Sequence, residues 1–158
     1  RYAQRFSTAS PNMVFSGAPG LGKTFLSACI ARTVSERGFS VAYDSATAAL
    51  GAFEREKFSR DPDETAEAAN TVKHYLNCDL MILDDLGTEM NTAFTQSALY
   101  TLINQRLTAG LPMIISTNLT EADLSDRYTP QITSRLLGEY QWLHFVGTDI
   151  RRLKERYP

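Results

Sequence analysis

The sequence Gly17-Ala18-Pro19-Gly20-Leu21-Gly22-Lys23-Thr24 matches the pattern G-x-x-x-x-G-K-[ST] in full. An apolar run (12–16) precedes it and an amphipathic stretch (24–37) follows it, so the context is strand, loop and helix. Glycines let backbone N–H groups turn inward around a phosphate, and the helix start adds free N–H groups and a favourable dipole. We therefore expect Lys23 to reach the β- and γ-phosphates of a nucleotide and the Thr24 hydroxyl to hold Mg²⁺. The alternative, a glycine-rich turn that matches by coincidence, is disfavoured by the correct flanks. The expected nucleotide-binding set is this loop together with Phe25.

Length and composition limit the classes of protein to which the chain can belong. Its 158 residues suffice for about one domain, and its 43% apolar and 22% charged residues are near the globular average. A net charge of −2 excludes an overall basic field, so any contact with nucleic acid must come from a local patch. The two cysteines, Cys29 and Cys78, are typical of reduced thiols in a cytoplasmic protein, not of a disulfide framework or a zinc site. No apolar run approaches the ~18 residues of a membrane span, and we expect no membrane partner.

Apolar segments alternate with helical patterns along the chain, which predicts a parallel sheet with helices on both faces. Pro62 following Asp61, and Thr120 three residues before Asp123, are typical of helix starts. We predict strands at 12–16, 40–43, 80–83, 112–117 and 141–146. We predict helices at 24–37, 61–77, 92–107, from 120, at 129–138, and a last basic helix from 148.

Two carboxylates end the buried strand Met81-Ile82-Leu83-Asp84-Asp85. Ligands of doubly wound sheets bind at the carboxyl ends of strands. We expect Asp84 to lie beside the phosphate loop and hold Mg²⁺ through water, and Asp85 to polarise an attacking water. The alternative is that the pair only ends the strand and forms a turn. Glu89 is close in sequence, but a direct role for it is disfavoured.

The strand Ile114-Ile115-Ser116-Thr117-Asn118 turns polar at its end. An amide at Asn118 could hydrogen-bond both the γ-phosphate and the attacking water, although a turn residue before the helix cap is the alternative. Arg135 lies one turn from the end of a short predicted helix. Charge there either compensates the helix dipole or acts as an arginine finger toward a neighbouring subunit, and Arg127 is a rival for that role.

Five motifs in this order resemble the bacterial primosomal helicase-loader ATPases of the AAA+ superfamily and the closely related IstB-type transposition ATPases. They are the phosphate loop, M-I-L-D-D-L-G-T-E, I-I-S-T-N-L, I-T-S-R-L-L-G and G-T-D-I-R, and the resemblance spans residues 2–154. It implies an α/β fold with a five-stranded parallel sheet in the order 5-1-4-3-2, ATP or ADP with Mg²⁺ as cofactors, and ATP hydrolysis. By the same resemblance Asn118 is the sensor 1 residue, Arg135 is the arginine finger of a head-to-tail assembly, and Arg151 lies near the nucleotide.

The resemblance also bears on what surrounds this chain. It begins at Arg1 and not at Met, and its end at Pro158 leaves no room for the helical lid of typical AAA+ proteins. In the loader family an N-terminal domain grips the replicative helicase, and that part is absent here. We expect residues 1–158 to be a single AAA+ ATPase domain, the C-terminal part of a longer protein. Asp85 stands where most AAA+ proteins have Glu, so water activation is expected to be weaker.

One segment, residues 52–60, falls where loader and initiator ATPases present an extra helix toward single-stranded DNA. Phosphate contacts and stacking would come from Arg55, Lys57 and Arg60 with Phe53 and Phe58. The alternative is a solvated helix in which two glutamates cancel much of the charge. A second basic cluster closes the chain, and we expect most of it to face solvent apart from Arg151; its members are Arg151, Arg152, Lys154 and Arg156.

The expected function is an ATP-driven switch that loads a ring helicase onto single-stranded DNA. The nearest alternative is an IstB-type ATPase that assists a transposase on the same fold. An alternative of another class is a small-molecule P-loop kinase, which would need an acceptor pocket and an arginine-rich lid that the sequence does not show. A third alternative is a nucleotide sensor that does not hydrolyse ATP.

Overall fold

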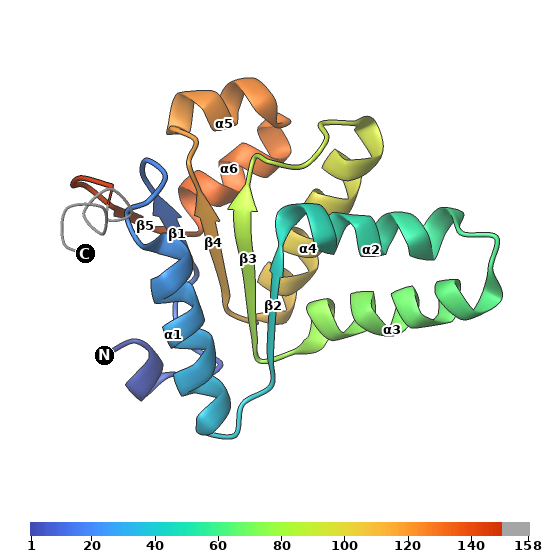
Figure 1. Cartoon of the computed structure of the whole chain (residues 1–158), viewed down its shortest axis with the longest axis horizontal. Coiled ribbons are helices and arrows are strands. Elements are labelled where there is room, and N and C mark those ends of the chain that lie inside the picture. The colour runs from blue at the N-terminus through green and yellow to red at the C-terminus, as the bar shows by residue number, and fades with distance from the viewer. Residues whose placement is uncertain (150–158) are drawn as a thin grey trace, which may run out of the picture.

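A sheet of five parallel strands forms the centre of the molecule in the computed structural model, which describes residues 1–149 (Figure 1). The strands run in the order β2-β3-β4-β1-β5, and every neighbouring pair is parallel. This is the order 5-1-4-3-2 read from the opposite edge, so the predicted fold is confirmed. The strands are β1 (Met13–Ser16), β2 (Val41–Ser45), β3 (Leu80–Leu86), β4 (Met113–Thr117) and β5 (Gln141–His144).

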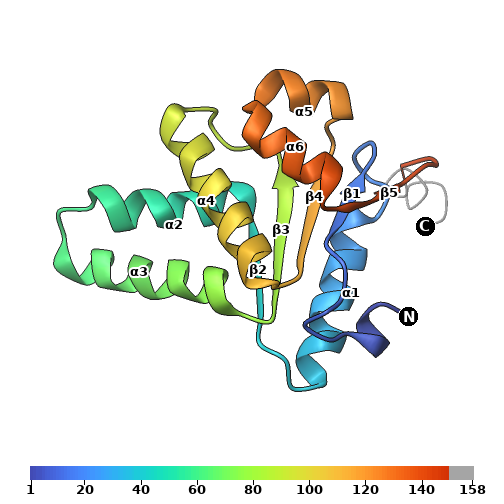
Figure 2. The same ribbon diagram turned by 180° about the vertical axis from the view of Figure 1, so that it is seen from behind.

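Helices cover both faces of this sheet (Figures 1 and 2). Successive residues of a strand point to opposite faces, and two separate apolar clusters result. Ile82 packs with α1 on one face, whereas Met81 and Leu83 pack with the helices of the other face. The helices are η1 (Ala3–Arg5), α1 (Lys23–Glu36), α2 (Ala46–Phe58), α3 (Pro62–Asn77), α4 (Ala93–Ala109), α5 (Glu121–Arg127) and α6 (Pro130–Gly138).

Several predicted helix ends are confirmed at the level of single hydrogen bonds. The Asp61 side chain accepts from the N–H groups of Asp63 and Glu64 at the start of α3. Thr120 and Asp123 exchange side-chain and backbone hydrogen bonds at the start of α5, which is a capping box. Each cap satisfies N–H groups that the first turn of a helix leaves without partners.

The helix α2 begins six residues before the segment expected to form it. Ser45, the last residue of β2, also caps α2, since its side chain accepts from the N–H of Ala48. The buried residues Ala46, Ala49, Leu50 and Ala52 of α2 pack in the core between α2, α3 and the sheet, and this packing stabilises a helix that the sequence pattern did not predict. The antiparallel pair α2–α3 extends beyond the edge strand β2 (Figure 1).

The strand β3 continues through both aspartates to Leu86, three residues beyond the predicted end. Its pairing with β4 is irregular between Leu83 and Leu86, and Asp85 has a φ of 56°. The backbone at this position is left-handed, a conformation that Asn and Asp adopt more readily than other non-glycine residues. Because of this irregularity, the side chains of Asp84 and Asp85 do not simply alternate between the two faces of the sheet as in a regular strand.

A buried arginine connects the segments that precede β3 and β4. Arg106 on α4 is fully buried and donates to the carbonyl oxygens of Tyr75 (2.7 Å), Cys78 (3.0 Å) and Pro112 (2.7 Å). Burial lowers the pKa of Arg106. These bonds join the end of α3 to the segments that lead into β3 and β4.

The described residues contain no helix whose length and apolar character would let it cross a membrane. The last basic helix expected from residue 148, with Arg151, Arg152, Lys154 and Arg156, lies outside the described residues apart from its first two positions.

Candidate functional site

The phosphate loop joins β1 to α1, as the sequence predicted. Gly22 caps α1 with a φ of 92°, a backbone conformation that glycine adopts without a Cβ penalty. Lys23 is 5% exposed, and its Nζ donates to the carbonyl oxygens of Gly17 (2.6 Å) and Ala18 (2.9 Å). The ammonium group is therefore folded into the loop, against carbonyl oxygens that it can exchange for phosphate oxygens.

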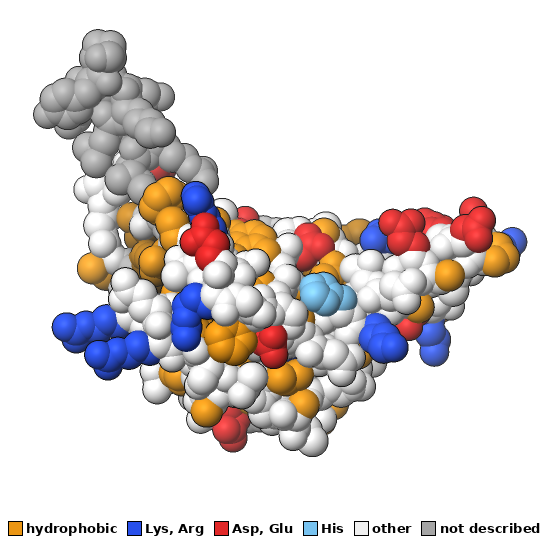
Figure 3. Space-filling model, turned by 90° about the horizontal axis from the view of Figure 1, so that it is seen from below, with side chains coloured by type: hydrophobic (Ala, Val, Ile, Leu, Met, Phe, Trp, Pro, Cys, Tyr) orange, Lys and Arg blue, Asp and Glu red, His pale blue; other side chains and the backbone are white. Residues whose placement is uncertain are grey.

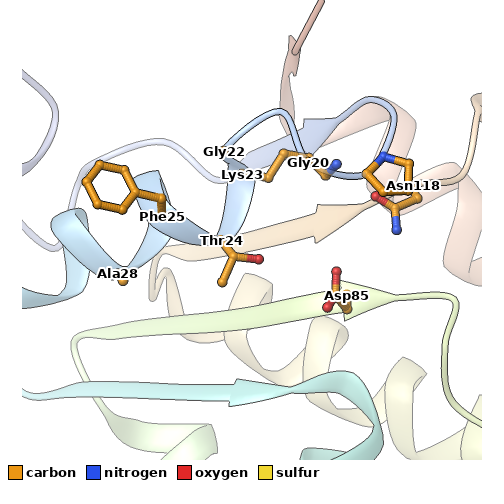
Figure 4. A pocket seen from close by; sticks show the side chains of 9 residues that line it. Gly20, Gly22, Lys23, Thr24, Phe25, Ala28, Asp85 and Asn118 are labelled. Atoms are coloured by element: carbon orange, nitrogen blue, oxygen red, sulfur yellow. The ribbon is translucent and has the colours of Figure 1, made fainter. Parts of the chain in front are cut away.

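A cavity of about 580 Å³ opens over this loop (Figure 4). It brings together residues from the phosphate loop, the end of β3 and the end of β4, all at the carboxyl edge of the sheet. Among the predicted site residues Pro19, Gly20, Gly22, Lys23, Thr24, Phe25, Asp85 and Asn118 line it, and Ala28 lines it too. Most of the residues expected to handle a nucleotide thus share one cavity.

The two aspartates lie in different surroundings. Asp85 lines the cavity, as do Thr24 and Asn118 (Figure 4). Asp84 is buried and accepts hydrogen bonds from the hydroxyl groups of Tyr43 (2.8 Å) and Ser116. The sequence predicts Asp84 beside the phosphate loop, and this stays a prediction: the Asp84 carboxylate lies between Tyr43 of β2 and Ser116 of β4, and Asp85 lines the cavity.

Tyr43 and Ser116 are site residues that the sequence reasoning missed. Tyr43 stands on β2 opposite Ile82 of β3, and Ser116 stands on β4 two residues before Asn118. Burial and the hydrogen bond to Asp84 raise the pKa of Tyr43, so its phenol keeps the proton that it donates. The sequence signal that could have pointed to Ser116 is the polar end of the fourth strand, where Ser116 precedes Asn118 by two residues.

Glu89 and Arg127 serve the structure around the cavity. Glu89 is buried and accepts from the N–H of Gly87 at 2.8 Å and from the hydroxyl of Tyr128. Arg127 donates to the carbonyl oxygen of Glu89 and lies 3.6 Å from its carboxylate. Both side chains connect the loop after β3 with α5. Because Arg127 is used in these contacts, it is a weaker candidate than Arg135 for the arginine finger.

Arg135 does not line the nucleotide cavity of its own chain. Its Nε donates to the Asn104 side chain at 3.0 Å, and its Nη2 donates to the Tyr100 hydroxyl at 3.1 Å. The side chain therefore lies on the face formed by α4 and α6. An arginine that acts on a neighbouring subunit's nucleotide must lie away from its own, and Arg135 meets that requirement.

The segment that follows β5 packs against the phosphate loop. A Cβ atom at Gly17 would lie 2.4 Å from the carbonyl oxygen of Phe145, and one at Gly20 would lie 1.9 Å from a carboxylate oxygen of Asp149. The backbone of Phe145 leaves no room for a side chain at Gly17, whereas the Asp149 side chain beside Gly20 could move aside. Arg151, which was expected near the nucleotide, lies outside the described residues.

The residues present fit a magnesium ion carried by a nucleotide. The Thr24 hydroxyl and the Asp85 carboxylate line the same cavity, and oxygen is the ligand that Mg²⁺ prefers. Within residues 1–149, no cluster of three or more His, Cys, Asp and Glu could hold a metal ion. Mg²⁺ in such sites takes one or two protein oxygens and completes its shell with phosphates and water.

The α2–α3 pair carries the segment expected to meet DNA. Arg55 and Lys57 are exposed on α2, and Arg60 is exposed in the turn that follows. Phe53 is only 8% exposed and packs in the core, so the expectation that it stacks on bases is wrong. Phe58 is exposed, although its ring already packs against Phe94 with centroids 4.9 Å apart. Seen from below, basic side chains are scattered among acidic ones (Figure 3).

Comparisons with known proteins agree with this geometry. Residues 3–154 match the family described as IstB-like ATP binding protein. The replicative helicase loader DnaC of Escherichia coli (strain K12) is 23% identical over 146 residues, which cover 92% of this chain and 58% of that protein. The loader DnaI of Bacillus subtilis is 30% identical over 115 residues, covering 72% of this chain and 35% of that protein. Rv3427c, an insertion-sequence protein of Mycobacterium tuberculosis, is 26% identical over 116 residues, covering 73% and 44% respectively.

Solved structures share the fold. The DnaC helicase loader superposes with a TM-score of 0.76 at 20% identity, covering 92% of this chain and 84% of that chain. The replication initiator DnaA bound to AMPPCP and single-stranded DNA superposes with a TM-score of 0.77 at 20% identity, covering 98% and 48%. The chain spans about three-fifths of the E. coli loader with which it aligns. With its parallel sheet, its phosphate loop and a family match over nearly its whole length, the chain belongs to the IstB-like ATP-binding proteins.

Proposed function

We propose that this chain is an ATP-hydrolysing switch that loads a replicative helicase onto single-stranded DNA. The observation that carries the proposal is the cavity in which the phosphate loop faces Asp85 and Asn118. The helicase loaders among its relatives support the choice of partner. The two free cysteines fit a cytoplasmic protein.

Binding begins at the phosphate loop. The N–H groups of the loop and of the first turn of α1 surround the phosphates, and Lys23 leaves the Gly17 and Ala18 carbonyl oxygens for a phosphate oxygen. The Thr24 hydroxyl and the aspartates would hold Mg²⁺, which neutralises charge on the phosphates when bound. Phe25, which is 73% exposed at the edge of the cavity, offers a ring face to the rest of the nucleotide.

Hydrolysis then needs a positioned water. Asn118 orients this water against the γ-phosphate through its amide, and the Asp85 carboxylate accepts a hydrogen bond from it and draws its proton. Asp84, held by two hydroxyl groups, supplies negative charge beside Asp85 and would help to hold the Mg²⁺ of the nucleotide through water. A shorter carboxylate than glutamate makes the reaction slow until a partner completes the site.

Arg135 of a neighbouring subunit completes that site. Because Arg135 and Lys23 belong to different surfaces of the chain, the contact is head-to-tail and generates an arc or spiral instead of a two-fold dimer. Loss of the γ-phosphate loosens the contact, so nucleotide state controls assembly. Arg55, Lys57 and Arg60 would touch the DNA strand.

The helicase itself would be gripped by a part of the protein outside this chain. We propose that residues 1–158 are a single AAA+ domain that follows an N-terminal partner-binding domain in a longer protein. The share of the E. coli loader that aligns, 58%, supports this arrangement.

A second function is favoured by a specific observation. The family that matches is the IstB-like one, and one relative belongs to an insertion sequence, so assistance to a transposase is the competing proposal. A pull-down with the native full-length protein and ATP, scored for helicase and for transposase, separates the two. Phosphate release measured with and without single-stranded DNA and helicase tests hydrolysis, and its absence under every condition would favour a sensor that only binds.

A further inference from the structure

One hydroxyl group on β4 contacts both aspartates. The Ser116 Oγ donates to Oδ1 of Asp84 and accepts a hydrogen bond from the backbone N–H of Asp85 at 2.9 Å. Ser116 is fully buried near the carboxyl end of β4, which is an inner strand of the sheet. A hydroxyl can donate once and accept at the same time, so this single group uses both capacities on the acidic pair.

The N–H bond to Ser116 replaces a bond of the regular ladder. The register between β3 and β4 shifts between Leu83 and Leu86, and Asp85 lies in that gap with a φ of 56°. A left-handed backbone is unfavourable for a residue with a Cβ. The hydrogen bond to Ser116 therefore holds a conformation that the strand alone would not keep.

That conformation decides where the Asp85 carboxylate lies. Asp85 lines the cavity with Thr24 and Asn118 (Figure 4). Asp84 lies between the hydroxyl groups of Tyr43 and Ser116. A regular strand would point two successive side chains to opposite faces of the sheet. The backbone departs from regular strand geometry at Asp85, and the hydrogen bond from its N–H to Ser116 lies at this departure.

We infer that Ser116 is a positioning residue for nucleotide hydrolysis, which aims Asp85 into the cavity and holds Asp84 behind it. The inference rests on the proposed ATP hydrolysis for its main readout. Ser116 acts through the two aspartates and needs no contact with the nucleotide. Tyr43 differs from it in a useful way, since the Tyr43 hydroxyl bonds Asp84 and makes no bond to Asp85.

Four variants separate positioning from simple support of the fold. Ser116→Ala removes the shared hydroxyl with almost no change of volume, and Ser116→Thr retains it. Tyr43→Phe removes the bond to Asp84 alone. Thr95→Val is the matched control: Thr95 is buried, its hydroxyl donates to the Met90 carbonyl at 2.7 Å and accepts from the Thr92 N–H at 2.9 Å, and no bond joins it to the aspartates.

The first measurement is steady-state hydrolysis at a temperature where every variant is folded by circular dichroism. We expect Ser116→Ala to lower kcat by about tenfold or more and to leave KM for ATP within about threefold, because the phosphate loop, which the substitution leaves intact, makes most of the contacts to the nucleotide. We expect Tyr43→Phe to lower kcat less than Ser116→Ala does, and Ser116→Thr to retain most of the wild-type kcat. Thr95→Val should hydrolyse ATP like the wild type despite a lower Tm.

The second measurement does not depend on hydrolysis. Mn²⁺ retained by the protein with ADP is measured by electron paramagnetic resonance, beside ADP affinity without metal. We expect Ser116→Ala to weaken Mn²⁺ retention by about fivefold and to leave metal-free ADP affinity unchanged. If the wild type retains Mn²⁺ and ADP but releases no phosphate, the proposed hydrolysis is wrong, and Mn²⁺ retention alone decides on Ser116.

Two results would overturn the inference. One is a Ser116→Ala protein that matches Thr95→Val in both kcat and Mn²⁺ retention. The other is a Ser116→Thr protein, folded and as impaired as Ser116→Ala, because the hydroxyl would then not be the cause.

Discussion

The guanidinium carbon of Arg135 lies 4.7 Å from the centre of the Tyr100 ring and stacks on its face. The stack and the bond to Asn104 hold a cation on the α4–α6 surface, outside the cavity of its own chain. This geometry is what a residue that acts on a neighbouring molecule requires.

Arg135→Ala should therefore separate binding from assembly. We expect ATP affinity to stay within about twofold of the wild type, while hydrolysis loses its dependence on protein concentration. Phosphate release measured across a range of protein concentrations checks this. Arg32→Ala, which removes an exposed arginine of α1, is the control and should behave like the wild type. Undiminished hydrolysis by Arg135→Ala at high protein concentration would show that the finger lies elsewhere.

Lys23→Ala should lose nucleotide binding. The ammonium group is poised 2.6 and 2.9 Å from two loop carbonyl oxygens, and charge-assisted bonds to phosphate are worth about 1.5–3 kcal/mol, so affinity should fall about 10- to 100-fold. Titration with a fluorescent ATP analogue measures it. Lys73→Ala removes an exposed lysine of α3 and should leave the affinity unchanged. Equal affinities for the two variants would contradict the assignment of Lys23.

Asp85→Asn should bind ATP and fail to hydrolyse it. Asparagine tolerates the left-handed backbone at this position, so the fold is retained while the carboxylate is lost. General-base groups contribute about 10²- to 10⁴-fold, and we expect kcat to fall within that range. Single-turnover phosphate release checks it, with Asp126→Asn on the exposed side of α5 as the control. A kcat within about threefold of the wild type would exclude Asp85 as the base.

Removal of three basic side chains near the α2–α3 turn should weaken binding of single-stranded DNA. Each phosphate contact contributes about 0.7 to the slope of log affinity against log salt, so the slope should fall by about 2. Fluorescence anisotropy at several salt concentrations measures it for the triple alanine variant of Arg55, Lys57 and Arg60.

A charge-matched control belongs with that experiment. The second triple alanine variant changes the exposed residues Arg5, Arg32 and Lys73, which lie on other elements. If both triple variants lose the same affinity and slope, the effect is one of net charge, and the α2–α3 turn is not the DNA site.

Arg106→Met should destabilise the fold without touching the cavity. The change leaves the buried carbonyl oxygens of Tyr75, Cys78 and Pro112 without this donor, at a cost of about 3–5 kcal/mol. For a chain of this size the Tm should fall by about 10 °C. Thermal unfolding by circular dichroism measures it. Arg32→Met, which alters an exposed pair with Glu36, should leave the Tm unchanged.

Local sequence determined the phosphate loop, most of the helix caps and the order of the elements. The conformation of residues 17–24 is determined locally, because the glycines and the helix start that follows them define the loop without contacts from distant residues. The caps at Asp61 and Thr120 are equally local, since each bonds N–H groups two or three residues away. The sheet order followed from the family resemblance and not from periodicity.

The tertiary structure alone decided how the acidic pair is arranged. Asp84 and Asp85 are adjacent in sequence, yet Ser116 and Tyr43, which determine their surroundings, come from strands on either side of β3. The early start of α2 and the burial of Phe53 also depend on packing against α3 and the sheet. Such contacts join residues tens of positions apart, and no local pattern encodes them, because the energy of a buried hydrogen bond or apolar contact exists only once the strands have met.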